Sequence, residues 1–181
     1  MVSISERPPE VEDRAVPGHW EGDLILGSTA SGSAIGTLVE RATRFTLLLH
    51  LPDGHTALAV QEAIVAKMAG LPAILRKTLT WDQGKEMANH IEIAAATDLD
   101  IYFCDPHSPW QRGTNENTNG LLRQYFAKGT DLSVFPADYL DYVATKLNRR
   151  PRQTLGWKTP AEALDELLSN PFKPPAVAST A

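Results

Sequence analysis

The sequence predicts an α/β domain built on a mixed sheet, because of the order of its hydrophobic segments. Three apolar stretches come first without a helix between them, at Trp20–Leu26, Ala34–Val39 and Phe45–Leu51. Short turn-forming runs separate these stretches, which predicts an antiparallel meander. Strand-like segments then alternate with helical patterns, and this order favours parallel pairing, with helices over the faces of the sheet.

The alternating part begins with a helical pattern at Thr56–Ala69, in which apolar residues recur every four positions. A strand follows at Lys77–Asp82, a helix at Asn89–Thr97 and a short buried strand at Ile101–Cys104. The expected sheet therefore has five strands, three antiparallel ones followed by two parallel ones.

The last third of the chain is expected to be helical. One helix starts near Thr114 or Asn115 and runs toward Phe126, and a second covers Ala137–Leu147. A capping box at residues 159–162 opens a short third helix. We expect an N-terminal arm or linker at 1–18, one core domain at 19–170 and a flexible tail at 171–181.

The composition excludes several classes of protein. The 181 residues are 43% hydrophobic, which is enough for one compact core. The single cysteine, Cys104, cannot form an internal disulfide, and no paired Cys or His spacing indicates a structural zinc site. No stretch has the roughly 18 apolar residues of a membrane span, and the first residues lack the pattern of a signal peptide. We therefore expect a cytoplasmic protein without a membrane partner.

The net charge of −5 argues against a nucleic-acid partner, but the distribution of charge does not. Residues 1–105 contain eight Lys and Arg against fifteen Asp and Glu, whereas residues 106–158 contain eight against four. A basic segment of this kind can bind phosphates, although a solvated surface would explain the same counts.

Two aspartates stand at unusual places in the expected strands. Asp23 interrupts an apolar strand, where an unpaired charge is costly, unless it lies at a sheet edge or pairs with an arginine. Asp82 ends its strand just before Gln83 and Gly84. Ligand sites gather at the carboxyl ends of such strands, although an aspartate before glycine also suits a simple turn.

Glu116 lies in the first turn of an expected helix, where the helix dipole favours an acid in any protein. Two aspartates on separate strands and a glutamate on a following helix can nevertheless converge at one end of a sheet. Three carboxylates that share a site need cations. Hard oxygen ligands suit Mg²⁺ or Mn²⁺, and two such ions can hold both the attacking and the leaving oxygens of a phosphodiester.

Three motifs carry a resemblance to a known family: GHWEGDL at 18–24, TWDQGKE at 80–86 and RGTNEN at 112–117. Together they resemble the insertion-sequence-thirty family of bacterial transposases. The 33 residues between Asp82 and Glu116 are similar in number to those in related Asp-Asp-Glu transposases and retroviral integrases. The resemblance covers most of the chain, from Arg7 to the LGWKTP motif at 155–160.

This resemblance implies a ribonuclease H-like fold and an integrase-type catalytic core that cleaves and joins DNA strands. Asp23, Asp82 and Glu116 would be the catalytic residues and would hold a two-metal site of Mg²⁺ or Mn²⁺. The implied partner is DNA, both element ends and target, bound by a homo-oligomer associated with the nucleoid. Complete members of the family carry an N-terminal helix-turn-helix region, which does not precede Arg7 here.

Basic and amide residues near Glu116 are candidates for contacts with DNA. Asn119 and Arg123 share its helix face, and Arg112 lies four residues before it. Lys128 and Arg149 are further candidates. For Arg149, however, basic residues followed by a proline are also a common way for a helix to end.

Two other functions fit the same residues. The chain could be a ribonuclease H-like nuclease that hydrolyses DNA without joining it. It could also be a truncated, non-catalytic regulator that binds DNA or dimerises with a full-length transposase.

Overall fold

The fold is seen in a computed structural model that describes residues 1–12 and 14–169. A six-stranded mixed sheet forms its centre, with strand order β1-β6-β5-β2-β3-β4. The strands are β1 (Val2–Ser3), β2 (His19–Leu26), β3 (Ala34–Glu40), β4 (Thr46–Leu51), β5 (Thr78–Trp81) and β6 (Asp100–Phe103). The helices are α1 (Ala57–Ala69), α2 (His90–Thr97), α3 (Gly113–Leu122), α4 (Ala137–Asn148) and α5 (Pro160–Ser169).

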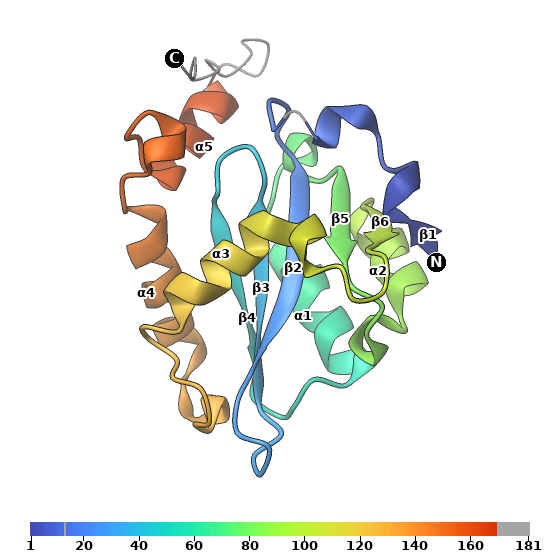
Figure 1. Cartoon of the computed structure of the whole chain (residues 1–181), viewed down its shortest axis with the longest axis vertical. Coiled ribbons are helices and arrows are strands. Elements are labelled where there is room, and N and C mark those ends of the chain that lie inside the picture. The colour runs from blue at the N-terminus through green and yellow to red at the C-terminus, as the bar shows by residue number, and fades with distance from the viewer. Residues whose placement is uncertain (13, 170–181) are drawn as a thin grey trace.

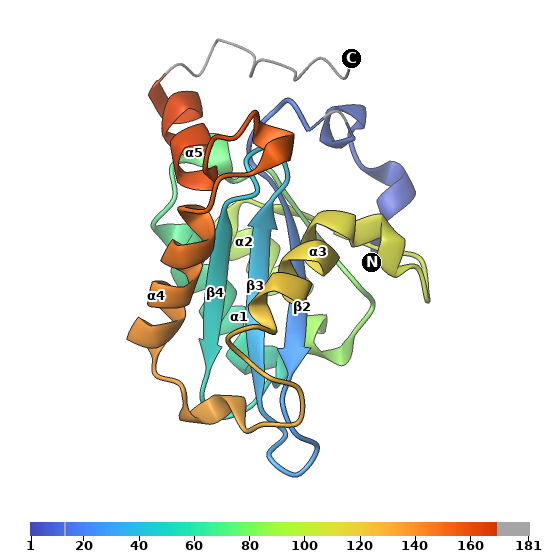
Figure 2. The same ribbon diagram turned by 60° about the vertical axis from the view of Figure 1, so that its left-hand side comes forward.

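The pairing follows the predicted order. Strands β2, β3 and β4 form the antiparallel meander, and β5 and β6 join it in parallel on the other side of β2. Helices α1 and α2 cover one face of the sheet, while α3 and α4 lie across the other (Figure 1 and Figure 2). None of the helices in the described ranges is long and apolar enough to cross a membrane.

The predicted strand count of five is one short. Val2 and Ser3 pair in parallel with Tyr102 and Phe103, so the expected arm contributes the sixth strand. A pair of residues has no measurable periodicity, and its place depends on main-chain hydrogen bonds to the free edge of β6. The arm continues with a short 3₁₀ helix at Pro9–Val11, in which Val11 is buried.

The other elements end close to their expected positions. Helix α3 stops at Leu122 instead of continuing toward Phe126, which is buried and packs beneath α4. At the start of α5 the main-chain N–H of Glu162 donates to the Thr159 hydroxyl at 3.1 Å, as one half of the predicted capping box requires. The expected tail at 171–181 lies outside the described residues, and the domain boundaries at 18 and 170 stay a prediction.

One glycine controls how closely β2 approaches the side chains of β5. A Cβ atom at Gly22 would lie 2.1 Å from the ring of Trp81, which is fully buried. The indole therefore lies directly across the backbone of β2, and its Nε1–H donates to the Glu86 carboxylate at 3.1 Å. Gly22 and Trp81 immediately precede the two aspartates predicted for the site.

Candidate active site

Asp23 lies on β2 with its side chain 27% exposed, on the face of the sheet that α3 covers. Its Oδ1 accepts from the main-chain N–H of Leu24 at 2.9 Å, and its Oδ2 accepts from the side-chain amide of Asn119 at 3.2 Å. Burial raises the pKa of this carboxyl group, although the nearby guanidinium of Arg112 acts in the opposite direction. Asp23 is thus a carboxylate that the protein keeps largely out of water.

Asp82 follows the last residue of β5 and is 44% exposed. The parallel register pairs Glu21 with Thr80, and two residues further along both strands it brings Asp23 level with Asp82. The Oδ1 atom of Asp82 accepts from the main-chain N–H of Gly84 at 3.2 Å, as a turn-forming aspartate would. Both of the expected roles, turn residue and site residue, therefore fit Asp82.

A single arginine connects the two carboxylates. Arg112 Nη1 lies 3.2 Å from Oδ2 of Asp23, and Nη2 lies 3.4 Å from Oδ2 of Asp82. Nη1 also donates to the main-chain carbonyl of Gly22 at 2.8 Å, and the side chain is only 8% exposed. Burial lowers the pKa of this guanidinium, but the two aspartates more than compensate, so its net shift is upward.

The environment of Arg112 differs from the one expected for it at the sequence level. An arginine that contacts DNA phosphates should present its guanidinium to solvent, whereas this one is turned into the protein toward two carboxylates. In the described structure it supplies the positive charge that keeps Asp23 and Asp82 side by side. The assignment of Arg112 to DNA contact stays a prediction.

A second buried ion pair lies behind the aspartates, where none was expected. Glu21 is fully buried and pairs with Nη1 of Arg41, while its other oxygen accepts from the main-chain N–H of Asn115 at 2.7 Å. The Asn115 amide donates to the carbonyl of Glu21 at 3.1 Å and to the hydroxyl of Thr37 at 3.1 Å. These bonds fix the start of α3 against the middle of β2.

Glu116, the third predicted acid, directly follows Asn115 in the first turn of α3 and is exposed. Within residues 1–12 and 14–169, no group of three His, Cys, Asp or Glu side chains lies close enough to hold one metal ion. The structure therefore brings Asp23 and Asp82 together, and Glu116 does not join them in a group of three among the described residues. One turn later on the same helix face, Oδ1 of Asn119 is buried and has no hydrogen-bond partner in the described part of the chain.

The remaining candidate residues are spread around this end of the molecule. Arg123 directs its guanidinium at the main-chain carbonyl of Leu26, at 3.2 Å, and so helps to hold α3 on β2. Lys128 and Arg149 are exposed. The loop before α3 exposes Trp110 by 71%. None of these positions, by itself, establishes a contact with DNA.

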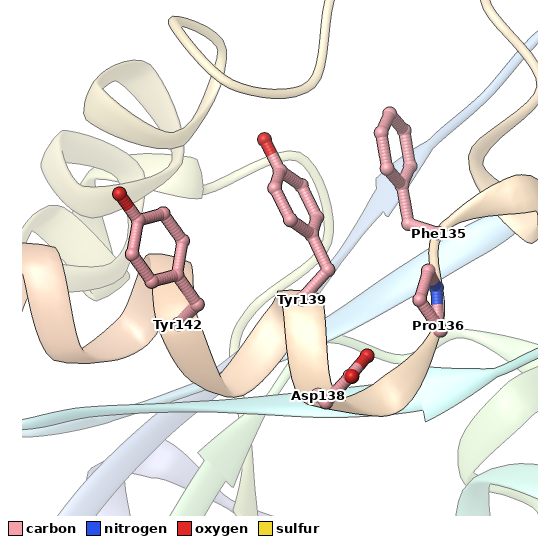
Figure 3. A pocket seen from close by; sticks show the side chains of 5 residues that line it. All are labelled: Phe135, Pro136, Asp138, Tyr139 and Tyr142. Atoms are coloured by element: carbon pink, nitrogen blue, oxygen red, sulfur yellow. The ribbon is translucent and has the colours of Figure 1, made fainter.

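A shallow pocket lies elsewhere, at the start of α4. Phe135 and Tyr139 stack there with ring centroids 5.2 Å apart, and Tyr142 continues the row (Figure 3). Asp138 is the one ionisable residue in its lining besides the tyrosines. Because polar groups do not converge in this pocket, the chemistry is better placed at the two aspartates.

Residues 13–109, more than half of the chain, match a protein family described as the integrase core domain. The chain belongs to the integrase core domain family. The matched range of this integrase core includes Asp23 and Asp82 and ends before Glu116. Three sequence motifs predicted that the chain resembles a family of bacterial transposases. Named relatives of the chain confirm this prediction.

Two relatives show the closeness of the match. The integrase core is 58% identical, over 94% of its length, to the transposase for insertion sequence element IS1086 of Cupriavidus metallidurans. It is 51% identical, over 90% of its length, to the transposase InsI for insertion sequence element IS30C of Escherichia coli. The chain spans 50% of the first of these proteins and 42% of the second, so it corresponds to about half of each.

Solved structures confirm the fold. A chain of the simian T-cell lymphotropic virus intasome superposes with a TM-score of 0.69 at 19% identity, covering 92% of this integrase core and 60% of that chain. The catalytic core domain of BIV integrase superposes with a TM-score of 0.61 at 18% identity, covering 86% of this chain and 99% of that domain. The fold is therefore ribonuclease H-like, as the motifs implied.

Proposed function

We propose that this chain is the catalytic core of an insertion-sequence transposase, which cleaves DNA and joins the released ends to target DNA. The observation that carries the proposal is the pair of carboxylates, Asp23 on β2 and Asp82 just after the end of the neighbouring parallel strand β5, which one buried guanidinium contacts together. Such a pair is suited to metal-assisted phosphoryl transfer, and the two relatives described above are transposases.

The residues present fit a divalent cation of the hard type. Asp23 and Asp82 supply carboxylate oxygens, and the buried Oδ1 of Asn119, which has no hydrogen-bond partner among the described residues, is a third oxygen on the Asp23 side. We assign Glu116, three residues before Asn119 on α3, as a further ligand of the site. When bound, Mg²⁺ or Mn²⁺ would lower the pKa of an attacking water and stabilise the leaving oxygen.

The side chains of the protein have separate tasks in this reaction. In cleavage, a water oxygen attacks the phosphorus and the bond to the 3′-oxygen breaks, which leaves a 3′-hydroxyl. In joining, that hydroxyl attacks a phosphodiester of the target, and one P–O bond forms as another breaks. Asp23 and Asp82 would hold the cation, Asn119 orients Asp23 through its amide, and Arg112 balances the two negative charges.

The test is a cleavage and joining assay with a labelled duplex, once uncut and once pre-cut to expose a 3′-hydroxyl, in the presence of Mn²⁺. Asp23→Asn, Asp82→Asn and Glu116→Gln should each lower both activities by about 100-fold or more. Asp53→Asn removes the same charge at an exposed turn position and should keep wild-type activity. Cleavage without joining of the pre-cut duplex would favour the simple nuclease.

Metal binding can be measured without activity. Mn²⁺ should raise the melting temperature (Tm) of the wild type by mass action, and Asp82→Asn should lose most of that increase because an amide is a poorer ligand for a hard cation. If Mn²⁺ leaves the Tm of the wild type unchanged and Glu116→Gln has no effect, the chain is the non-catalytic regulator instead.

A further inference from the structure

Four arginines gather at the end of the sheet next to the start of α3. Arg14 belongs to the N-terminal arm, Arg41 and Arg44 to the turn between β3 and β4, and Arg152 to the loop after α4. These segments lie at the same end of the sheet in both views of the ribbon (Figure 1 and Figure 2). We call these four residues the arginine cluster.

Hydrogen bonds fix the segments that carry the cluster. The side-chain amide of Asn148, at the end of α4, exchanges two bonds with the backbone of Thr46, which joins the loop after α4 to the β3–β4 turn. Nη1 of Arg14 donates to the hydroxyl of Thr114, which joins the arm to α3. The four guanidinium groups are therefore brought together by long-range contacts. Burial lowers the pKa of each; repulsion by other members of the cluster adds to this for Arg14, Arg41 and Arg44, and repulsion by Arg150 adds to it for Arg152.

The carboxylates near the cluster are already occupied. Glu21 is bound by Arg41 and by the main-chain N–H of Asn115. Glu40 accepts from the main-chain N–H of Gly18 at 3.1 Å and from Thr43 at 2.6 and 2.7 Å. The exposed carboxylate of Glu12, which also lies near the cluster, pairs with Arg7.

Three arginines of the cluster are left without an acidic partner in the described residues. Arg14 binds a neutral hydroxyl, and Nη2 of Arg152 donates to the main-chain carbonyl of Leu147 at 3.3 Å. Nε of Arg152 is buried without a hydrogen-bond partner among residues 1–12 and 14–169. Within the same ranges, the side chain of Arg44 makes neither a hydrogen bond nor an ion pair, and like the other two it is half-buried.

The backbone at Arg44 is strained as well. Its φ angle of 64° lies in the left-handed region, where residues with a side chain are uncommon. The bonds of Glu40 to Thr43 and the main-chain bond from Arg44 N to Glu40 O build this turn, so the conformation is imposed by its surroundings. Strain together with unbalanced charge is typical of a site that is kept for a ligand.

The cluster borders on the two aspartates. Glu21 is two residues before Asp23, so both side chains point to the same face of β2. Arg14 reaches Thr114, which is two residues before Glu116 in α3. A DNA strand bound at the aspartates would carry a phosphate every ~3.4 Å of helix axis, and the next phosphates would pass over these arginines.

We infer that Arg14, Arg44 and Arg152 form a binding site for backbone phosphates of DNA beside the carboxylate pair. The assignment rests on the proposed function for the identity of the ligand, and it adds a surface that the three motifs of the family do not mark. The arginine fork is the side chain best suited to phosphate oxygens, and Arg41 supports the site from behind through its pair with Glu21.

The test measures binding of a fluorescent 30-base-pair duplex in EDTA, where no cleavage takes place, over a range of salt concentrations. The slope of log K against log salt is negative, and each lost phosphate contact should make it less steep by about 0.9. Arg44→Gly should show this decrease, with affinity reduced roughly fivefold to tenfold near 0.1 M salt. The double variant Arg44→Gly/Arg152→Gln should lose about twice as much slope.

Two controls separate charge from structure. Lys67→Gln removes one positive charge on α1 that pairs with Asp141 of α4 and not with the arginine cluster, and it should keep the wild-type slope. Arg44→Gly relieves both the positive φ angle and the like-charge repulsion, so its Tm should be about 2 to 4 °C higher than that of the wild type while its DNA binding weakens.

An unchanged salt slope in Arg44→Gly overturns the inference, whatever its Tm, and so does an equal loss of slope in Lys67→Gln. Inorganic phosphate is the second probe: if it protects the wild type but not Arg44→Gly from heat while DNA binding ignores Arg44, the cluster binds a free anion instead. Because binding is measured in EDTA, this test does not depend on cleavage. If the protein binds DNA through Arg44 but never cuts it, the phosphate site stands and only the proposed function fails.

Discussion

The two faces of the sheet carry different kinds of side chain. On the face covered by α1 and α2, one apolar cluster extends from Trp20 on β2 to Phe103 on β6. On the other face, apolar packing of α4 and the end of α3 occupies only one part, around Ile25 and Leu147. The remainder of that face presents polar and charged side chains, which on the two central parallel strands are His19, Glu21, Asp23, Thr78 and Thr80.

This difference separates the face that packs the larger apolar cluster from the face that carries the proposed site. The apolar face gains free energy roughly in proportion to the area that it buries, at about 25 cal/mol per Å². On the polar face a fully buried charge is stable only with a partner, and the bonds of Glu21 and Arg112 are examples of such pairing. A single lost partner should therefore cost more on the polar face than a lost methyl group costs on the apolar one.

The largest expected effect is on the polar face. Arg41→Leu leaves Glu21 fully buried without its cationic partner and should lower the free energy of unfolding by about 3–5 kcal/mol, as measured by urea denaturation. The double variant Glu21→Leu/Arg41→Leu should recover part of this loss, since no charge is then left unpaired. A loss below about 1 kcal/mol in the single variant would show that the pair contributes little.

A smaller effect is expected on the apolar face. Ile64 on α1 is fully buried in the apolar cluster, and Ile64→Val should cost about 1 kcal/mol in the same urea experiment. Cleavage of DNA per folded molecule should stay at the wild-type level because this residue lies across the sheet from the aspartates. A variant with normal stability and impaired cleavage would contradict the separation of the two faces.

The smallest effect concerns pH. Burial lowers the pKa of His19 below its ordinary 6.5, although the hydrogen bond to Glu10 acts in the opposite direction. The unfolded chain then binds more protons than the folded one just below pH 6.5, so this contribution to stability is present above 6.5 and is lost as pH falls through the lowered pKa. Thermal melts between pH 7.5 and 5 should show a larger decrease for the wild type than for His19→Gln. Equal decreases would mean that His19 is not titrating in this range.

Much of the fold could be predicted from the sequence because its strands are long enough to show a period. The meander and the two parallel strands follow from runs of apolar residues between turn signals. The edge strand β1 could not be predicted, since Val2 and Ser3 carry no pattern and depend on the free edge of β6. The end of α3 was placed too late because Phe126 continues the apolar face after the helix has ended.

The site could be predicted only in part. Asp23 and Asp82 are recognisable from the strands that carry them, and their proximity follows from the parallel register. The partnership of Arg112 with both could not be predicted, because a basic residue four positions before a glutamate reads as a surface charge. A signal for the polar face was present: His19, Glu21 and Asp23 alternate with Trp20, Gly22 and Leu24, and Thr78, Thr80 and Asp82 alternate with Leu79 and Trp81.

The contact of Gly22 with the ring of Trp81 makes the distance between the two aspartates depend on packing at the opposite face of the sheet. Gly22 takes no part in the proposed reaction, yet the first carbon of any other side chain would have to displace the indole or separate β2 from β5. Substitution there would change catalysis and folding together. Tolerance to mutation along this strand is thus set by a residue that has no side chain, and directed evolution of this chain should find position 22 closed while exposed turn positions such as Asp53 stay open to change.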